Sequence, residues 1–322
     1  MEGIDVTQSK KEMIFSEKPT NNCHASTVLP LADGTVLAAW FGGTKEGKDD
    51  VNICVSRRSA DGWFTPQQLT ADPDTAHWNP VLTLCEDGKV ILFFKVGKKI
   101  PSWQTFFCIS ADNGESWSAP QELVPGDSGG RGPVKNKCIR LSNGALLAPA
   151  STEHNNLWKC FTDTSTDNGA SWTRSEDIKN RVGLLKFVGA IQPSLWESAP
   201  GTVHMLVRTN AGEIYRADST DFGASWSALY STGLPNNNSG LDLVKMPDGS
   251  LLLVMNPVGG NWGERTPLVL LQSTDNGASW TELMKLEDQP GEYSYPAIEQ
   301  KDGKAYITYT YNREYVAYWE IG

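Results

Sequence analysis

The sequence lacks several features that would place it in common protein classes. It has no run of about 18 consecutive apolar residues, which excludes a membrane-spanning helix. The first ten residues, MEGIDVTQSK, lack the apolar centre of a signal peptide. The six cysteines show no C-x-x-C spacing, so we expect buried thiols in a cytoplasmic protein, the simplest compartment for them. A secreted chain whose leader has been removed would have the same sequence.

Clustered positive charge is also missing. The formal net charge is −10, without any acidic block, and this argues against nucleic acid as a partner because phosphate binding requires grouped Lys and Arg. An anionic small substrate stays compatible, since a few arginines in a pocket can hold one carboxylate. The acidic loop with Glu46, Asp49 and Asp50 has no EF-hand-like spacing and is interpreted as solvated, so no metal is expected. The oligomeric state is left open.

One eight-residue pattern, S-x-D-x-G-x-x-W, occurs four times. The copies begin at Ser110, Ser165, Ser219 and Ser273. Their tryptophans lie 55, 54 and 54 residues apart, and a shortened copy, Ser59–Trp63, ends another 54 residues upstream. This fixed period predicts one continuous repeat domain over residues 1–322. In each copy Asp and Ser can bind local backbone, Gly supplies a positive φ, and Trp can pack between sheets, so we interpret the pattern as structural.

A second repeated signal is a two-residue turn between apolar runs. It occurs at Asp33-Gly34, Asp87-Gly88, Asn143-Gly144, Pro200-Gly201, Asp248-Gly249 and Asp302-Gly303. Such pairs predict β-hairpins, and helical periodicity is almost absent. Four short strands in each of six units predict an all-β, six-bladed β-propeller. The last unit lacks its fourth strand, and we expect residues 12–16 (EMIFS) to complete it and close the ring.

The octapeptide resembles the Asp-box of the BNR-repeat, sialidase-like six-bladed propellers. The resemblance covers nearly the whole chain and implies the fold. It does not by itself imply the reaction, because one fold supports many functions.

The expected topology selects candidate site residues. Hairpin turns and Asp-boxes share one face of a propeller, whereas the starts of the innermost strands surround the axis on the other face. These starts, with the loops after the second strands, supply the expected substrate-binding residues Asn79, Lys95, Arg131, His154, Gln192, Asn237, Tyr295 and Arg313. The expected catalytic residues His24, His77, Arg208 and Tyr293 come from the same positions, whereas His204 lies within a strand and is interpreted as structural. Aromatic, amide and charged groups at an axis suit a carbohydrate.

Comparison with sialidases of this fold gives a partial match. Those enzymes use three arginines for the substrate carboxylate, a Tyr nucleophile activated by Glu, and an Asp acid. Arg208 resembles the second arginine, Tyr293-Ser294 resembles the nucleophile, and residues 49–50 (DD) match the acid loop. The F/Y-R-I-P motif of the first arginine is absent, and residues 22–25 (NCHA) take its place. Gln192-Pro193 stands where those enzymes carry Glu-Pro, and Gln cannot act as a base, so the resemblance does not imply ordinary sialidase activity.

Two histidine motifs indicate another reaction. His24-Ala-Ser and His77-Trp-Asn-Pro look similar to a lyase group of sialidase-like propellers that acts on rhamnose-capped glucuronate. This resemblance implies β-elimination, in which a cation neutralises the carboxylate and His or Tyr removes the C5 proton. We therefore predict a polysaccharide lyase that needs no cofactor. In it His24 and His77 share the base and acid roles, Tyr293 competes as base, and Arg208 and Arg131 hold the carboxylate.

The remaining assignments complete the prediction. Gln192, Asn79 and Asn237 are expected to bind sugar hydroxyls. Two alternatives stay open: a sialidase-like hydrolase that uses Tyr293 with an acidic-loop Asp, and a propeller that binds glycans without catalysis.

Overall fold

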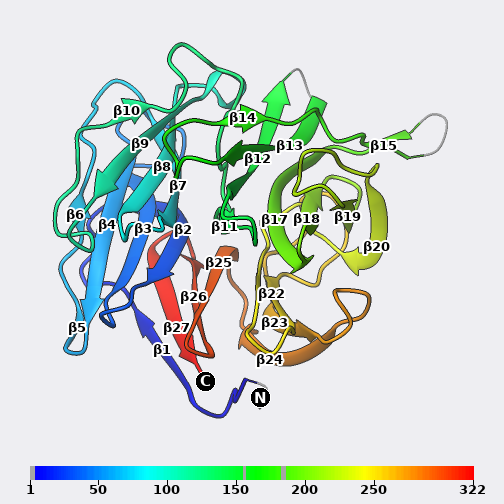
Figure 1. The fold of residues 1–322 in the computed structure, drawn as a ribbon. Helices are drawn as coiled ribbons and strands as arrows, with labels where there is room; N and C mark the ends of the chain where they lie inside the picture. Colours follow the sequence, from blue (N-terminus) through cyan, green and yellow to red (C-terminus); the bar gives the residue numbers. More distant parts are fainter. Residues whose placement is uncertain (1–3, 155–156, 183–185) are drawn as a thin grey trace.

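The computed structural model describes residues 4–154, 157–182 and 186–322. These residues form six sheets around a central axis, and the only helical element among them is a single 3-10 turn, Ile100–Ser102 (Figure 1). The predicted six-bladed β-propeller is confirmed. Inner strands contact one another between blades 1 and 2, 4 and 5, 5 and 6, and 6 and 1, and the inner strand of blade 4 contacts the second strand of blade 3.

The first three blades follow in chain order. Blade 1 contains β2 (Asn22–Pro30), β3 (Val36–Gly43), β4 (Asn52–Ser59) and β5 (Gly62–Trp63), with β6 (Gln67–Gln68) also paired to β4. Blade 2 contains β7 (His77–Leu84), β8 (Val90–Val96), β9 (Gln104–Ser110) and β10 (Gln121–Glu122). Blade 3 contains β11 (Ile139–Arg140), β12 (Leu146–His154), β13 (Leu157–Ser165) and β14 (Thr173–Arg174).

A short hairpin, β15 (Arg181–Val182) and β16 (Lys186–Phe187), precedes the last three blades. Blade 4 contains β17 (Ala190–Ala199), β18 (Thr202–Thr209), β19 (Glu213–Ser219) and β20 (Tyr230–Pro235). Blade 5 contains β21 (Asp242–Lys245), β22 (Leu251–Met255), β23 (Leu268–Ser273) and β24 (Thr281–Glu287). Blade 6 contains β25 (Tyr293–Lys301), β26 (Lys304–Tyr311), β27 (Tyr315–Ile321) and the N-terminal β1 (Ser9–Met13).

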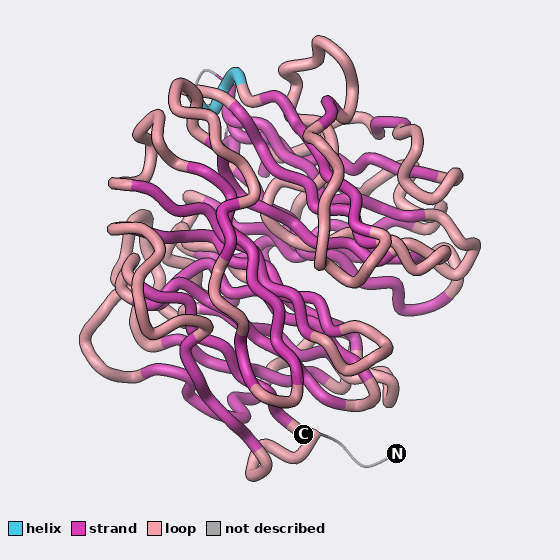
Figure 2. The backbone as a smooth tube through the Cα atoms, turned by 90° about the vertical axis from the view of Figure 1, so that its left-hand side faces the viewer, coloured by secondary structure: helices cyan, strands magenta, loops and turns pink. Residues whose placement is uncertain are grey.

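The ring closes through the N-terminal strand, as predicted. Strand β1 pairs antiparallel with β27, and both chain ends lie at the same edge of the molecule (Figures 1 and 2). The strand begins three residues earlier than expected. Its polar first half forms the exposed outer edge, whereas Ile14 and Phe15 leave the sheet and are buried. The ring centroid of Phe15 lies 5.3 Å from that of Trp40 in blade 1, so burial of the apolar pair ends the strand.

Each Asp-box is a hydrogen-bonded turn packed on the preceding blade. In the first copy Ser110 Oγ donates to Asp112 Oδ1 at 2.8 Å, and the Ser116 amide donates to the same oxygen at 2.9 Å. The Gly114 amide donates to Ser110 Oγ at 2.8 Å. A Cβ atom on Gly114 would lie 2.6 Å from a methyl group of Leu37 in blade 1, so only glycine allows this approach. These contacts support the structural interpretation of the repeat.

Hairpin turns and Asp-boxes share one face, as the topology predicts. Asn113 in the Asp-box of blade 2 donates to Asp33 in the hairpin turn of blade 1 at 2.7 Å. Asn168 of blade 3 accepts the Glu86 amide of blade 2 at 3.0 Å. The opposite face is therefore free of Asp-boxes and carries the starts of the inner strands.

The predicted buried thiols are confirmed. All six cysteines are buried and unpaired, and burial raises the pKa of Cys138 to about 12. Within the described ranges, no helix has the length and apolarity to cross a membrane.

Acid is expected to destabilise the fold through the Asp-boxes. Hydrogen bonds, the largest from the serine four residues later, lower the pKa of Asp112, Asp167 and Asp275 to about 2. An unfolded Asp titrates near about 3.9, so this stabilisation is present above that pH and is lost as the pH falls to about 2. The melting temperature should therefore fall steeply between these values.

Asp275→Asn should lower the melting temperature at neutral pH and reduce its drop on acidification. A variant that melts like the wild type at every pH would contradict this role of the Asp-box.

Candidate functional site

The inner strands of four blades, and the segment just before the inner strand of blade 5, each carry a residue with left-handed backbone conformation. These residues are Ala25, Asn79, Gln192, Asn238 and Tyr295, with φ between 45° and 56°. In four of the blades the pairing between the first and second strands shifts register at this point. Left-handed conformation is uncommon for residues other than glycine and persists where surrounding contacts hold it. The repetition around the axis indicates a built site.

Arg208 links three of these residues. Its side chain extends from β18 and is 3% exposed. Nε donates to Asn238 Oδ1 at 2.7 Å, and Nη1 donates to Gln192 Oε1 at 3.1 Å and to Tyr295 Oη at 2.6 Å. Gln192 Nε2 donates to Tyr295 Oη at 3.3 Å. The tyrosine oxygen therefore accepts two N–H groups, one from Arg208 and one from Gln192.

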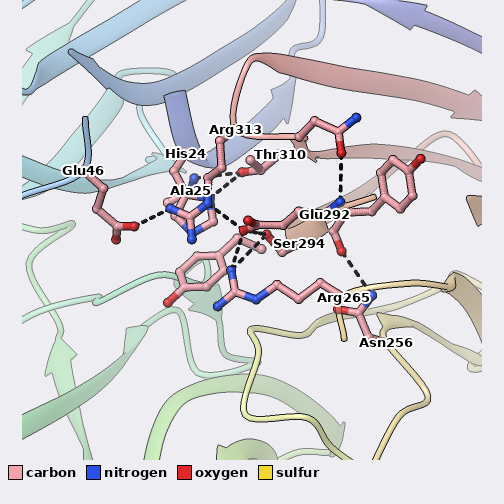
Figure 3. Close-up of polar contacts among 12 residues, drawn as sticks. His24, Ala25, Glu46, Asn256, Arg265, Glu292, Ser294, Thr310 and Arg313 are labelled. Carbon is pink, nitrogen blue, oxygen red and sulfur yellow. Dashed lines mark hydrogen bonds and ion pairs between the residues drawn. The ribbon is translucent and has the colours of Figure 1, made fainter. Parts of the chain in front are cut away.

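Two further arginines, Arg265 and Arg313, share the carboxylate of Glu292, close to Tyr295. Glu292 Oε1 accepts Arg265 Nη1 at 2.7 Å, Arg313 Nε at 2.6 Å and Ser294 Oγ at 3.2 Å (Figure 3). Arg313 also pairs with Glu46 from the loop after β3. Burial opposes ionisation of Glu292, but Arg313 and Arg265 hold the pKa of that carboxyl below its usual value. The carboxylate thus bridges two guanidinium groups.

His24 is a buried neutral base next to Tyr295. The two ring centroids are 4.1 Å apart, and His24 Nδ1 lies 2.8 Å from Thr310 Oγ1. Figure 3 shows the contact of His24 with Thr310, with Arg313 nearby. Burial lowers the pKa of His24 well below its usual value, and the positive charges of Arg313, Arg265, Arg208 and Lys135 lower it further. At neutral pH this imidazole is therefore uncharged. It can accept a proton, but it cannot act as an imidazolium acid.

Aromatic rings and one carboxyl group border Arg208. The guanidinium carbon lies 5.9 Å from the ring centroid of Trp158 and 5.8 Å from that of Trp262. Trp262 is 65% exposed, which leaves its ring accessible to a ligand. Glu153 lies near Arg208 at the end of β12, and burial raises the pKa of its carboxyl group.

The structure brings five of the predicted residues together. They are His24, Gln192, Arg208, Tyr295 and Arg313. Asn237 supports the group from behind, because its Nδ2 donates to the carbonyl oxygen of Glu264 at 2.5 Å in the loop that carries Arg265. Asn79 holds the equivalent left-handed position in blade 2 and is 5% exposed.

Tyr293 and His77 lie outside this group. Tyr293 is 2% exposed and packs in the core with its ring 5.1 Å from Tyr311, and burial raises the pKa of its phenol to about 12. Strand alternation places residues 293 and 295 on one side, but the left-handed backbone at Tyr295 breaks the alternation. His77 contacts Thr70 Oγ1 at 2.6 Å and stacks near Phe94, and its ring makes no hydrogen bond to the Arg208 cluster in the described part of the chain.

Three other predicted residues form a separate group between blades 2 and 3. Lys95 is fully buried, and its ammonium group donates to Thr105 Oγ1 and to the carbonyl oxygen of Arg131, both at 2.7 Å. Arg131 forms an ion pair with Asp163 at 2.7 Å. Arg131 and His154 line a cavity of about 490 Å³. Lys95 and Arg131 already have partners, so the structure places these two cations in blade packing and not beside Tyr295.

Sequence reasoning missed Arg265 and Glu292. Arg265 lies two residues after the glycine-rich stretch 259–263 (GGNWG) of a long loop, and Glu292 precedes β25. The arginine after that stretch could have been noticed in the sequence. Its position in space could not be predicted, because the loop is long.

Comparisons with known proteins agree with this architecture. A family model described as "BNR repeat-like domain" matches residues 34–307. None of the curated proteins matches the sequence. Among solved structures, a protein of unknown function from Dyadobacter fermentans has a TM-score of 0.77 at 17% identity, with 97% of this chain and 98% of that chain covered.

Two sialidases are also similar in structure. The NanB sialidase from Streptococcus pneumoniae has a TM-score of 0.76 at 16% identity, with 96% of this chain and 70% of that chain covered. The Trypanosoma rangeli sialidase has a TM-score of 0.74 at 17% identity, and 97% of this chain spans 59% of that one. At this identity the likeness establishes the fold.

The environment of His24 gives a testable titration. A histidine with its ordinary pKa is half protonated near about pH 6.5. The imidazole resonances of His24, measured by NMR, should still report the neutral ring at that pH, because burial and four nearby cations disfavour the charged form. Half protonation at or above this pH would contradict the described geometry.

Proposed function

The chain belongs to the family of BNR repeat-like domains, and on this premise we propose that it is a carbohydrate-active enzyme for a terminal anionic sugar that cleaves a glucuronate linkage by β-elimination. One observation carries the proposal. Arg208 and Gln192 donate to the oxygen of Tyr295, and a neutral His24 lies against its ring. Around them three guanidinium groups converge on the axis.

The charges favour an anionic ligand. The guanidinium carbons of Arg208 and Arg265 lie 5.6 and 5.7 Å from the ring centroid of Tyr295. Guanidinium groups bind carboxylates through paired hydrogen bonds, and a desolvated site strengthens the attraction. The exposed ring of Trp262 beside Arg208 offers an apolar face for a sugar ring. Cations beside an aromatic face therefore support a uronic acid as the ligand.

Elimination uses these groups directly. The arginines neutralise the carboxylate, which makes the proton on C5 more acidic. Tyr295 or His24 removes that proton, the electron pair forms the C4–C5 double bond, and the C4–O bond breaks. The leaving oxygen takes a proton from Tyr295 when His24 is the base, or from water when Tyr295 is the base. In this scheme Tyr295 has the role first assigned to Tyr293, and Arg265 and Arg313 replace Arg131.

Hydrolysis through a tyrosine nucleophile has less support. Such a nucleophile needs a base to take its proton. Gln192 occupies the position next to Tyr295 Oη, and an amide cannot serve as that base. Glu153 is the observation that favours this alternative, because a carboxyl group with a raised pKa near Arg208 supplies the acid that hydrolysis requires. Asp49 pairs with Lys98 instead, and Asp50 is hydrogen-bonded to Thr44.

The product distinguishes the reactions. Incubation with rhamnose-capped glucuronate glycans should give an unsaturated uronate that absorbs ultraviolet light and is lighter by one water than the hydrolysed sugar. Absorbance and mass spectrometry of the product check this. A saturated product would contradict elimination, and ligand binding without turnover on any glycan tried would favour a non-catalytic propeller.

The two tyrosines provide a matched pair of variants. Tyr295→Phe should lower kcat by about 10²-fold or more, the range for loss of a general acid or base. Tyr293→Phe should keep kcat and lower stability by about 1 kcal/mol at most, because its phenol lies in the core. Steady-state kinetics and thermal melting check both, and the reverse pattern would restore Tyr293 as the base.

A further inference from the structure

A buried tripeptide of blade 3, Lys135–Lys137, reaches across the propeller axis. The inner strand of this blade, β11, has 2 residues, whereas β2, β7, β17 and β25 have between 8 and 10. Residues 135–138 therefore lie outside the paired part of their own sheet, although the Val134 amide still donates to the carbonyl oxygen of Pro149 in β12 at 3.2 Å. Lys135, Asn136 and Lys137 are 3%, 1% and 9% exposed, which is unusual for lysine and requires buried partners.

The first two residues bind the backbone beside two of the left-handed positions. Lys135 Nζ donates to the carbonyl oxygens of Pro296, which follows Tyr295, and of Leu241 at 3.1 Å. It also donates to Asn136 Oδ1 at 2.8 Å, so its three N–H groups are all used. Asn136 Nδ2 donates to the carbonyl oxygen of Gln192 at 3.1 Å and to that of the next residue at 2.9 Å.

The third residue, Lys137, binds the inner strand of blade 5. Lys137 Nζ donates to Asp242 Oδ2 at 2.9 Å and to the carbonyl oxygen of Leu243 at 2.8 Å. Asp242 also accepts Ser194 Oγ of blade 4 at 2.6 Å and the Ile298 amide of blade 6 at 3.0 Å. Blades 3 to 6 therefore share one hydrogen-bonded centre, which this tripeptide supplies.

We propose that Lys135 is a positioning residue of the site, which holds the backbone beside Tyr295 and, through Asn136, the backbone of Gln192 so that both side chains reach Arg208. Its ammonium group lies 5.9 Å from the ring centroid of Tyr295 and adds a positive charge beneath the anion site. The inference rests on the proposed function for the ligand that the site receives, but the positioning itself is a property of the fold.

Close packing makes this arrangement rigid. A Cβ atom on Gly240 would lie 3.0 Å from Lys135 Cε and 3.5 Å from both Gln192 Oε1 and the Cα atom of Tyr295. The glycine therefore lets the lysine, the amide and the tyrosine backbone meet at one point. Burial lowers the pKa of Lys135 to about 7, with Asp242 opposing this and Lys137 and Arg208 reinforcing it.

The pKa of His24 depends on the positive charge of Lys135. The charged groups that face its imidazole are Arg313, Arg265, Arg208 and Lys135, with Glu292 and Glu46 paired to the first two. Removing one positive charge makes protonation of His24 easier, so its pKa should rise. A lysine that only filled space would leave this titration unchanged.

The test compares the wild type with Lys135→Met by NMR titration of His24 and by binding of D-glucuronate. We expect the pKa of His24 to rise by about half a unit or more and the affinity for glucuronate to fall about tenfold. Lys95→Met is the matched control for the titration, because Lys95 is equally buried, has its pKa lowered to about 7 by burial, and lies in blade 2. In that control the titration of His24 should not move.

Other outcomes have defined meanings. An unchanged His24 titration and unchanged affinity in Lys135→Met would overturn the inference. If that variant does not fold, Gly240→Ala, which presses on Lys135 and Tyr295, should weaken glucuronate binding several-fold, and unchanged binding would overturn the inference. If the wild type binds no glucuronate, the proposed function fails, and a crystal structure of Lys135→Met still tests the inference. In it Tyr295 and Gln192 should lose their contacts with Arg208, and unchanged contacts would overturn the inference.

Discussion

Repulsion among cations at the propeller axis is the constraint on which the site depends. Arg208, Arg265 and Lys135 all lie within 6 Å of the ring centroid of Tyr295. Like charges at this spacing in a desolvated site oppose one another, so they persist only with compensating groups. Glu292 and backbone carbonyl oxygens supply part of this compensation. An anionic ligand would supply more, and this is the physical reason for proposing an anion site at the axis.

The fold provides both the cations and the rigidity that holds them. Asp-boxes lock each blade to the preceding one on the far face, and β1 closes the ring. On the near face, left-handed residues redirect side chains from the inner strands toward Arg208. In blade 3 the inner strand is only two residues long, and the preceding residues Lys135–Lys137 bind groups of the opposite blades near the axis. The contacts that hold neighbouring blades together and the proposed site therefore lie at opposite ends of the same strands.

Much of this architecture follows from the sequence, and the limits have physical causes. The period of the Asp-box and the turn pairs predict six blades. Their phase selects His24 at an inner strand and Arg208 in the second strand of its blade, and both lie beside Tyr295 in the structure. Tyr293 and Tyr295 cannot be distinguished by strand alternation, since one left-handed residue reverses it. Arg265 lies in a loop whose path no short-range pattern predicts. Arg131 was expected at the axis because it precedes an inner strand. It pairs with Asp163 instead, a tertiary contact that no sequence pattern predicts.

The most direct test of an anion site at the axis is calorimetric binding of D-glucuronate and of its neutral methyl ester to the wild-type protein. The two ligands share their ring and hydroxyl groups and differ in the charge that the arginines are placed to hold. The account predicts that the acid binds at least about tenfold more tightly than the ester, the gain expected from charge-assisted hydrogen bonds. Equal affinities for the two ligands would contradict it.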